Sequence, residues 1–346
     1  MPRAPKINWP RAAVALAASI PKERLHAAAV RWTGGGSDAA RASWAVAFSG
    51  GADSLALLLL LWAHWPERRA RLVAVHFDHR LRGRASAADA KFCEQVCAAL
   101  GVKFVGGAWA GARKGASEAE ARAARFEFFQ RESGRRRIRA LWLGHQQDDI
   151  AETLLMRLAR GSGTGGLSAP RPVQAMPGGR VHVRPLLTLK KHELITALTA
   201  AGATWREDAS NETEDYFRNR IRHEGLPAWA ASATDRDALA GAALSRELLE
   251  EDDNALEAWL AELAPLSADG ARLDVRALQG KPRALVRRAL HRWLLAQADT
   301  GDLSRQGFAT LLAAVEKGSF TRFSLGRSGF AVIRKGLLIF EPVPIG

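Results

Sequence analysis

The chain has 346 residues, a length at which a single hydrophobic core usually gives way to two domains. Its 47% hydrophobic and 25% charged residues are the proportions of a soluble globular protein. The 50 lysines and arginines against 36 acidic residues give a net charge of +14, which favours a polyanionic partner, with nucleic acid first and an anionic membrane surface second.

Cysteine content and hydropathy exclude a disulfide-rich protein and a membrane-spanning protein. The two cysteines, Cys93 and Cys97, are too few for a disulfide framework, and their spacing predicts packing on one helix face. No apolar run approaches the ~18 residues of a membrane span. Residues 12–20 follow basic residues, as in a short signal peptide, but we interpret them as an alanine-rich helix that ends at Pro21. We therefore expect a reduced, cytoplasmic protein with no membrane partner.

Residues 1–43 are basic and alanine-rich, and we interpret them as a variable N-terminal extension. From residue 44 onwards, candidate strands alternate with candidate helices. The strands are expected at 44–48, 72–77, 102–106 and 140–144, and the helices at 53–64, 86–100, 117–132 and 148–159. This alternation predicts an α/β domain with a parallel sheet, in which ligands bind beyond the carboxyl ends of the strands.

The second half of the chain changes in character. Residues 161–185 are rich in glycine and proline and indicate an active-site loop. Helices are expected at 189–200, 215–223, 233–264, 281–297 and 304–316, and a small terminal hairpin or meander at 323–340. We therefore predict a catalytic α/β domain over 44–227 and a mostly helical C-terminal domain over 228–346.

The first segment that carries chemistry is Ser-Gly-Gly-Ala-Asp-Ser at residues 49–54, which we call the glycine loop. It lies between a candidate strand and a candidate helix, so backbone N–H groups and a helix N-terminus converge on one point. Gly50 and Gly51 allow a close approach to an anion, and Ser49 and Ser54 add hydroxyl donors. It is not a Walker loop, because no Lys-Ser/Thr pair follows its glycines. The loop predicts a phosphate site.

A second group of polar residues follows the fourth candidate strand. Gly144 and His145 come at the strand end, and the carboxylates of Asp148, Asp149 and Glu152 share one face of a helix that begins near residue 147. Acidic residues in a first turn also complement the helix dipole. A histidine and three carboxylates beside a phosphate loop nevertheless indicate a cation, either Mg²⁺ on a nucleotide or an amine-bearing substrate.

Arginines follow in two further places. Arg157 and Arg160 end the helix, where they either complement its dipole or hold a phosphate. Arg218 and Arg222 lie four residues apart on one helix face, for which a solvated surface is the usual meaning.

Together these segments resemble the tRNA(Ile)-lysidine synthetase family, a group of PP-loop ATP pyrophosphatases, over most of residues 44–340. The matching patterns are Ser-Gly-Gly-x-Asp-Ser at 49–54, His-x-Asp-His-x-Leu-Arg at 76–82, Ala-Arg-x-x-Arg-aromatic at 121–126, Gly-His-x-x-Asp-Asp-x-x-Glu-Thr at 144–153, Arg-Gly-x-Gly at 160–163, Arg-Pro-Leu at 184–186, Asp-x-Ser-Asn at 208–211 and Arg-Asn-x-Ile-Arg at 218–222. Arg80 stands where a glycine is common, and Thr164 where a leucine or another residue is usual. The pattern stops after what resembles the first C-terminal domain of longer members.

The resemblance implies a Rossmann-like PP-loop domain that uses ATP and Mg²⁺. It implies a ligase of tRNA processing that adenylates O2 of the wobble cytidine (position 34) of the minor isoleucine tRNA with a CAU anticodon. The ε-amine of free L-lysine then attacks C2, giving lysidine, AMP and pyrophosphate. The helical C-terminal domain would bind the tRNA, and a homodimer is compatible with the sequence.

The resemblance also assigns roles to residues. The nucleotide is expected at Ser49, Gly50, Gly51, Ala52, Asp53, Ser54, His76, Asp78 and Gly144. Catalysis is expected of Asp53, Arg125, His145, Asp148, Asp149 and Glu152, with Asp53 and Asp149 as Mg²⁺ ligands. Lysine and tRNA are expected at Arg122, Asp148, Glu152, Arg157, Arg160, Arg218, Asn219 and Arg222. His145 would position the nucleotide or transfer a proton.

Other functions stay open at this point. A PP-loop enzyme of tRNA 2-thiolation would need cysteines for persulfide chemistry or an iron–sulfur cluster, and Cys93 and Cys97 lie in mid-domain without companions. A PP-loop amide synthetase would usually come with a glutaminase domain. A non-catalytic RNA-binding protein would explain the charge of +14 but not the acidic cluster.

Overall fold

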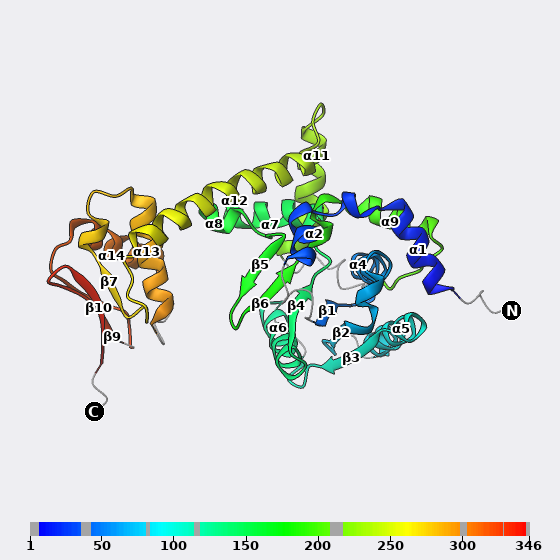
Figure 1. The fold of residues 1–346 in the computed structure, drawn as a ribbon. Coiled ribbons are helices and arrows are strands. Elements are labelled where there is room, and N and C mark those ends of the chain that lie inside the picture. The colour runs from blue at the N-terminus through cyan, green and yellow to red at the C-terminus, as the bar shows by residue number, and fades with distance from the viewer. Residues whose placement is uncertain are drawn as a thin grey trace. The chain divides into compact units, whose positions relative to one another are not determined.

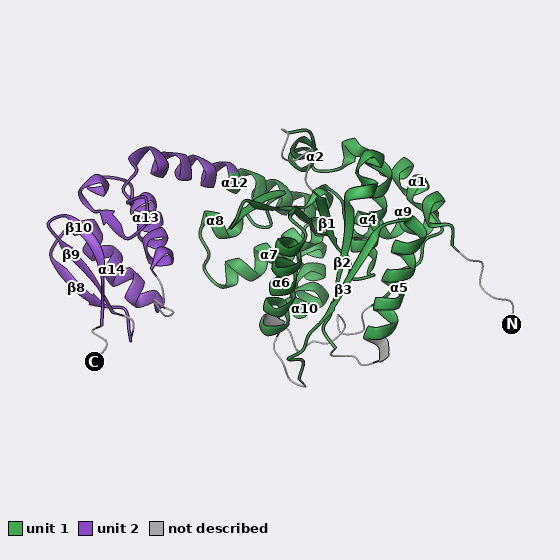
Figure 2. Cartoon of the chain, turned by 60° about the horizontal axis from the view of Figure 1, so that its bottom comes forward, with its two compact units in different colours: residues 1–250 green, residues 251–346 purple. Residues whose placement is uncertain are grey.

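The computed structural model describes residues 7–35, 43–80, 84–113, 118–207, 217–297, 303–327 and 329–343. The chain divides into two compact units, residues 1–250 and 251–346, and the division falls within helix α12 (Ala238–Leu263) (Figure 2). The sequence placed the domain boundary near residue 227 instead. The units divide later because Leu226 and Ala242 pack with Ile150 in one apolar cluster of the first unit.

The first unit is built on a six-stranded sheet with the order β3-β2-β1-β4-β6-β5 (Figure 1). Its strands are β1 (Ser43–Ala47), β2 (Leu72–Asp78), β3 (Lys103–Ala108), β4 (Ile138–Trp142), β5 (Val173–Met176) and β6 (Arg180–Val183). All neighbouring pairs are parallel except β5 and β6. The predicted α/β class with a mostly parallel sheet is confirmed.

Each face of this sheet buries its own apolar core. Along β1, Trp44 and Val46 belong to one core cluster, whereas Ala45 belongs to the other. On β2, Ala74 belongs to the first cluster and Val75 to the second. Successive side chains of a strand point to opposite faces, so strands that are apolar throughout are buried on both sides.

Helices cover both faces of the sheet (Figure 1). The main ones are α1 (Trp9–Ser19), α4 (Ala52–His64), α5 (Arg84–Leu100), α6 (Glu118–Arg135), α7 (Gln147–Ala159) and α9 (Lys191–Ala200). Residues of α1, α4, α5 and α9 fill the first core cluster, and Phe128 and Phe129 of α6 fill the second. Helix α4 is apolar on all sides, because it packs against the sheet and also against α1 and α9.

The N-terminal segment is an integral part of the first unit. Helix α1 and helix α2 (Ala27–Gly34) flank the short helix η1 (Lys22–Arg24). Trp9 and Leu16 are buried in the first core cluster, and the Trp9 ring meets the Phe92 ring edge-on at 6.0 Å. The segment predicted as an extension therefore contributes to the core that supports α4.

The prediction of an irregular loop over 161–185 was wrong in part. This stretch holds the short helix α8 (Thr164–Leu167) and the hairpin of β5 and β6, and β6 extends the parallel sheet beside β4. The hairpin turns at Gly178 and Gly179, whose φ angles are +76° and +69°. Two adjacent glycines with positive φ are typical of a tight β-hairpin turn.

The first unit has further short elements, and the second unit has a core of its own. The first unit also contains η2 (Pro66–Arg71), η3 (Pro185–Thr188), α10 (Phe217–Arg220), the π-helical turn η5 (Ile221–Gly225) and α11 (Leu226–Ser232).

The second unit holds β7 (Arg272–Asp274), η6 (Arg276–Leu278), α13 (Arg283–Ala296), α14 (Arg305–Lys317), β8 (Thr321–Ser324), β9 (Gly329–Arg334) and β10 (Leu337–Pro342). The expected terminal hairpin is part of a four-stranded antiparallel sheet with the order β7-β10-β9-β8.

The strand order brings the two polar segments of the sequence together. The chain passes from β1 outward to β2 and β3 and then returns to place β4 on the other side of β1, which makes β1 and β4 the topological switch point. Gly144, which follows β4, lies so close to α4 that a Cβ atom there would stand 3.0 Å from the Asp53 carbonyl oxygen and 3.2 Å from the Ser54 nitrogen. A glycine is therefore needed where the two segments meet.

We predict that Gly144→Ala destabilises the protein, because the contacts that block the methyl group are backbone atoms and must move. The expected loss is about 1–3 kcal/mol, as for other overpacked sites, measured by denaturant unfolding. Gly134→Ala is the matched control, since no atom lies within 4 Å of the added Cβ. Equal stabilities of the two variants would contradict the close approach.

Candidate functional site

The two serines of the glycine loop shape the loop itself. The Ser54 hydroxyl donates to the Gly51 carbonyl oxygen at 3.0 Å and accepts from the Ser49 N–H at 3.2 Å, and the two hydroxyl oxygens lie 3.1 Å apart. The φ angle of Gly50 is +93°, and a Cβ atom there would stand 3.1 Å from the Cys93 sulfur. The hydroxyl groups expected to bind phosphate are thus engaged within the loop.

The donors that the loop offers to a ligand are therefore main-chain groups. Helix α4 begins at Ala52, and Gly51 at its N-cap has no side chain with which to cap the first N–H groups. These groups and the helix dipole give the start of α4 a partial positive charge. Such an uncapped N-terminus after a glycine turn favours an anion, and phosphate is the usual one.

Asp53 lies in this first turn and has an unusual electrostatic setting. Its Oδ1 atom is buried and has no hydrogen-bond partner among the residues that the structure describes. Burial raises the pKa of Asp53 to about 7, with a further contribution from the negative charge of Asp149. An acid in this position is close to half-ionised at neutral pH, and a nearby cation would stabilise its charged form.

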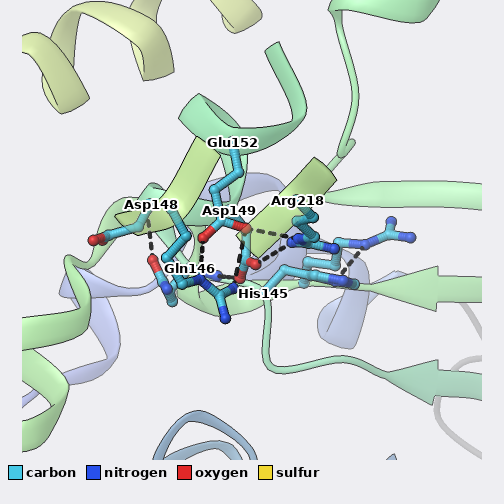
Figure 3. Close-up of polar contacts among 8 residues, drawn as sticks. His145, Gln146, Asp148, Asp149, Glu152 and Arg218 are labelled. Carbon is cyan, nitrogen blue, oxygen red and sulfur yellow. Dashed lines mark hydrogen bonds and ion pairs between the residues drawn. The ribbon is translucent and has the colours of Figure 1, made fainter. Parts of the chain in front are cut away.

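The start of α7 organises the acidic cluster (Figure 3). Gln146 caps the helix, since its side-chain oxygen accepts from the Asp148 N–H at 2.5 Å. Asp149 completes the capping box by accepting from the Gln146 N–H at 3.0 Å, and its other oxygen accepts from Arg218 at 2.6 Å. Asp148 accepts from the Lys191 N–H at 3.0 Å. Each aspartate is thereby fixed by a main-chain N–H group.

Glu152 is the most buried carboxylate of the cluster, with a side chain only 1% exposed. Its Oε2 atom accepts from Arg218 Nε at 2.7 Å and from Arg222 Nη2 at 3.0 Å, and its Oε1 atom accepts from Arg222 Nε at 2.6 Å. Two guanidinium groups therefore balance the charges of Asp149 and Glu152. In this structure the charge of Glu152, of which catalysis and lysine or tRNA binding are expected, is therefore paired with guanidinium groups.

His145 faces arginines rather than carboxylates. Arg184 donates its Nε–H to Nδ1 of His145 at 3.1 Å. Burial lowers the pKa of His145 well below its ordinary value, and the charges of Arg184, Arg218, Arg122 and Arg125 lower it further, in that order. The ring is consequently neutral at physiological pH, which argues against proton transfer by His145.

Two residues that hold the glycine loop were not anticipated from the sequence. The Arg206 N–H donates to the Gly50 carbonyl oxygen at 2.9 Å, and its Nε donates to the Asp89 carboxylate at 2.7 Å. Asp89 is buried on α5, and Arg206 follows α9. Nothing in the local pattern marks either residue, because the contact joins positions 117 residues apart.

Residues at the end of β2 hold main-chain groups after β1 and in the turn that follows β2. His76 hydrogen-bonds through Nδ1 to the Phe48 carbonyl oxygen at 2.9 Å and so fixes the end of β1. Asp78 accepts from the Arg80 N–H at 2.7 Å, and the φ angle of Arg80 is +55°. The left-handed backbone explains why a glycine suits this position, and why Arg80 is an unusual occupant.

The other expected residues are distributed around this centre. Arg122 and Arg125 of α6 lie over the Phe126 ring, at 4.9 and 5.6 Å from its centroid, and their charges reach His145. Arg157 donates to the Gly166 carbonyl oxygen, which orders the turn into α8, and Arg160 is an exposed residue at the C-cap of α7. Asn219 is buried on α10. The expected Asp-x-Ser-Asn pattern at 208–211 lies outside the described residues.

Comparison with known proteins agrees with this centre. The model of the PP-loop domain family matches residues 26–229, which include the glycine loop, α7 and the arginines that pair with Glu152. The chain belongs to the PP-loop family. The resemblance expected from the motifs is also confirmed, because the chain is 40% identical over 273 residues to a protein of Geobacter sulfurreducens named tRNA(Ile)-lysidine synthase. It is 37% identical over 290 residues to a protein of the same name from Solibacter usitatus.

These relatives are longer than the matched region. The alignments cover 76% and 80% of this chain but 56% and 61% of the relatives, so the chain spans little more than half of their length. Among solved structures, a U34-tRNA thiolase from Methanococcus maripaludis with a [4Fe-4S] cluster is similar to this PP-loop chain. Its TM-score is 0.52 at 15% identity, over 69% of this chain and 78% of that one. At this identity the likeness shows the fold alone.

Two further statements hold for the residues that the structure describes. None of the described helices combines the length and the apolar character needed to cross a membrane. Within the same residues, no group of three or more His, Cys, Asp or Glu side chains is arranged to hold a metal ion.

We predict that Glu152→Ala destabilises the first unit strongly, because it removes a buried carboxylate that pairs with both Arg218 and Arg222, and leaves Arg218 with Asp149 alone. Breaking one partner of a buried ion pair costs about 3–5 kcal/mol, measured here by thermal or denaturant unfolding. Glu120→Ala is the control: its pair with Arg113 is exposed at 44% and 70% and should contribute less than about 1 kcal/mol. A small loss in Glu152→Ala would show that the cluster is not held by this carboxylate.

The raised pKa of Asp53 predicts how stability depends on pH. Between pH 4 and about 7 the folded protein keeps a proton that the unfolded chain has lost, so Asp53 makes the protein less stable as pH rises through this range. Asp53→Asn should therefore match the wild type near pH 4 and exceed it increasingly up to pH 7–8. The difference in the free energy of unfolding between the two proteins should reach a few kcal/mol at most, since one pKa unit corresponds to about 1.4 kcal/mol. A difference that is constant over pH would refute the assignment.

Proposed function

We propose that this chain joins lysine to C2 of the wobble cytidine of a CAU-anticodon isoleucine tRNA, through an adenylated cytidine. The relatives that carry the name tRNA(Ile)-lysidine synthase support this reaction. The observation that carries the proposal is the uncapped start of α4 beside a buried aspartate with an unsatisfied oxygen. An anion and a cation are both required there, and a nucleotide triphosphate with its metal supplies both.

In the first step, O2 of the cytidine attacks the α-phosphorus of ATP, and the bond from that phosphorus to the bridging oxygen of the β-phosphate breaks. Pyrophosphate leaves, and AMP remains on O2. The main-chain N–H groups from Ala52 to Ser54 would hold the leaving pyrophosphate. Fixed donors at the place where charge develops are the main means of accelerating such a transfer.

In the second step, the ε-nitrogen of lysine attacks C2, the C2–O2 bond breaks, AMP leaves and the nitrogen loses a proton. We assign the lysine ammonium to Asp148. Its carboxylate meets a neutral N–H group, whereas Asp149 and Glu152 face guanidinium groups. Asp148 therefore keeps a net charge with which to attract a cation and to accept its proton.

The residues present fit a Mg²⁺ ion. Asp53 offers a buried oxygen without a partner, and a carboxylate whose pKa of about 7 a cation would lower. Asp53 would be the first protein ligand, and Asp149 a second one through the remaining lone pairs of its oxygens. The ion would supply neutralisation of phosphate charge.

The thiolation alternative is disfavoured by the cysteines themselves. Both Cys93 and Cys97 are buried and reduced. Burial raises the pKa of Cys97 to about 12 and raises that of Cys93 further. A thiol of this kind is a poor nucleophile and a poor metal ligand, because both roles need the thiolate.

The test is mass spectrometry of the wobble nucleotide after incubation of tRNA with the chain, ATP and lysine. We expect a cytidine that has gained one lysine and lost one water. Without lysine we expect pyrophosphate release that depends on the tRNA, and AMP attached to it. A transcript with uridine at the wobble position should give neither.

Asp53→Asn should lower the rate of pyrophosphate release by at least about 100-fold, in the range seen when one catalytic donor or ligand is removed. Asp235→Asn, at an exposed position of the same unit, is the matched control. Sulfur in the modified nucleotide, a requirement for ammonia, or pyrophosphate release without tRNA would each overturn the proposed function.

A further inference from the structure

Arg184 is a buried arginine to which the sequence assigned no role of its own. It follows β6 at the edge of the centre, and only 6% of the residue is exposed. Its Nη1 donates to the Arg171 carbonyl oxygen at 2.8 Å, which anchors the guanidinium group to the main chain. Its Nε–H then points at Nδ1 of His145, 3.1 Å away.

This contact decides which nitrogen of His145 carries the proton. A guanidinium group only donates hydrogen bonds, so Nδ1 must accept, and in the neutral ring the proton resides on Nε2. A doubly protonated ring would set an N–H against the Arg184 N–H. It would also add a positive charge to a ring already surrounded by Arg122, Arg125, Arg184 and Arg218. Both costs keep the ring in a single form.

The neighbours of His145 indicate what its Nε2–H group would meet. The preceding residue, Gly144, touches the first turn of α4 at the Asp53 carbonyl oxygen, so His145 borders the glycine loop. The positive charges of Arg122 and Arg125 on α6 and of Arg218 on α10 also act on its ring. Four positive groups around a neutral donor, next to a phosphate loop, favour an anionic oxygen as its acceptor.

We propose that Arg184 is a positioning residue that holds His145 in its Nε2–H form, and that His145 donates this hydrogen bond to a phosphoryl oxygen of the bound nucleotide. The second half of this inference rests on the proposed function. His145 then acts as a fixed neutral donor at the reacting phosphate, and no proton moves through it. This role also differs from metal binding, for which Nε2 would have to be free of its proton.

The tautomer is tested without tRNA or lysine. In the protein labelled with ¹⁵N-histidine, the nine histidines give separate ring correlations, and the His145→Gln spectrum identifies the pair that belongs to His145. We expect Nδ1 unprotonated and Nε2 protonated between pH 6 and 8. A protonated Nδ1 in the wild type would overturn the proposal.

Two Arg184 variants test its control over the ring. Arg184→Met removes the donor at similar length, and the ring should then populate both tautomers and titrate at higher pH. Arg184→Lys, which keeps a donor and a charge, should preserve the Nε2–H form. An unchanged tautomer in a folded Arg184→Met would overturn the positioning role. If Arg184→Met does not fold, Arg184→Lys decides instead, and loss of the Nε2–H form in that variant would overturn the role.

The proposed hydrogen bond from His145 to phosphate is tested by replacing His145 with glutamine or with asparagine. The side-chain nitrogen of His145→Gln falls near the place of Nε2, whereas that of His145→Asn falls near Nδ1. With ATP and tRNA, pyrophosphate release should fall by less than about 10-fold in the first variant and by about 100-fold in the second. Equal losses would overturn the hydrogen bond to phosphate. If the wild type releases no pyrophosphate at all, the proposed function fails, whereas the tautomer measurement still stands.

Discussion

The ion pairs of Glu152 with Arg218 and Arg222 are the interaction on which the functional centre depends. They join α7 to residues 66 and 70 positions further along the chain, so they connect the acidic helix to α10 and η5. They also balance the charge of the cluster. Asp149 and Glu152, which the sequence presents as part of a cation site, are thereby neutralised, whereas Asp53 keeps a buried carboxylate oxygen without a hydrogen-bond partner among the described residues.

The charges that remain are separated in a way that suits a metal nucleotide. On one side, the start of α4 and the arginines around His145 attract anionic oxygens. On the other side, Asp53 needs a positive neighbour for full ionisation. Phosphate groups with a bound cation satisfy both requirements at once, whereas an anion or a cation alone would satisfy only one. The basic excess of the chain adds a field that favours polyanions.

Much of the fold could be predicted from the sequence, because the central strands and α4, α5 and α7 are long and strongly periodic. The hairpin of β5 and β6 was missed because each strand has four residues, although Gly178 and Gly179 were a usable signal. In the site, the motifs located the glycine loop and α7. They could not reveal that Arg218 neutralises Glu152, or that Arg184 contacts His145, because such pairings arise only when distant segments fold together.

The absence of a side chain at Gly50 has a consequence for the cysteine beneath it. The Cys93 sulfur fills the space that a Cβ at this glycine would enter, so the thiol forms the floor of the loop. Burial raises its pKa, and a thiol reacts with alkylating reagents only as an accessible thiolate. Labelling of Cys93 must therefore await a fluctuation that lifts α5 from the loop. The rate of Cys93 labelling therefore reports how often α5 separates from the glycine loop, and a ligand bound at the loop should slow this labelling.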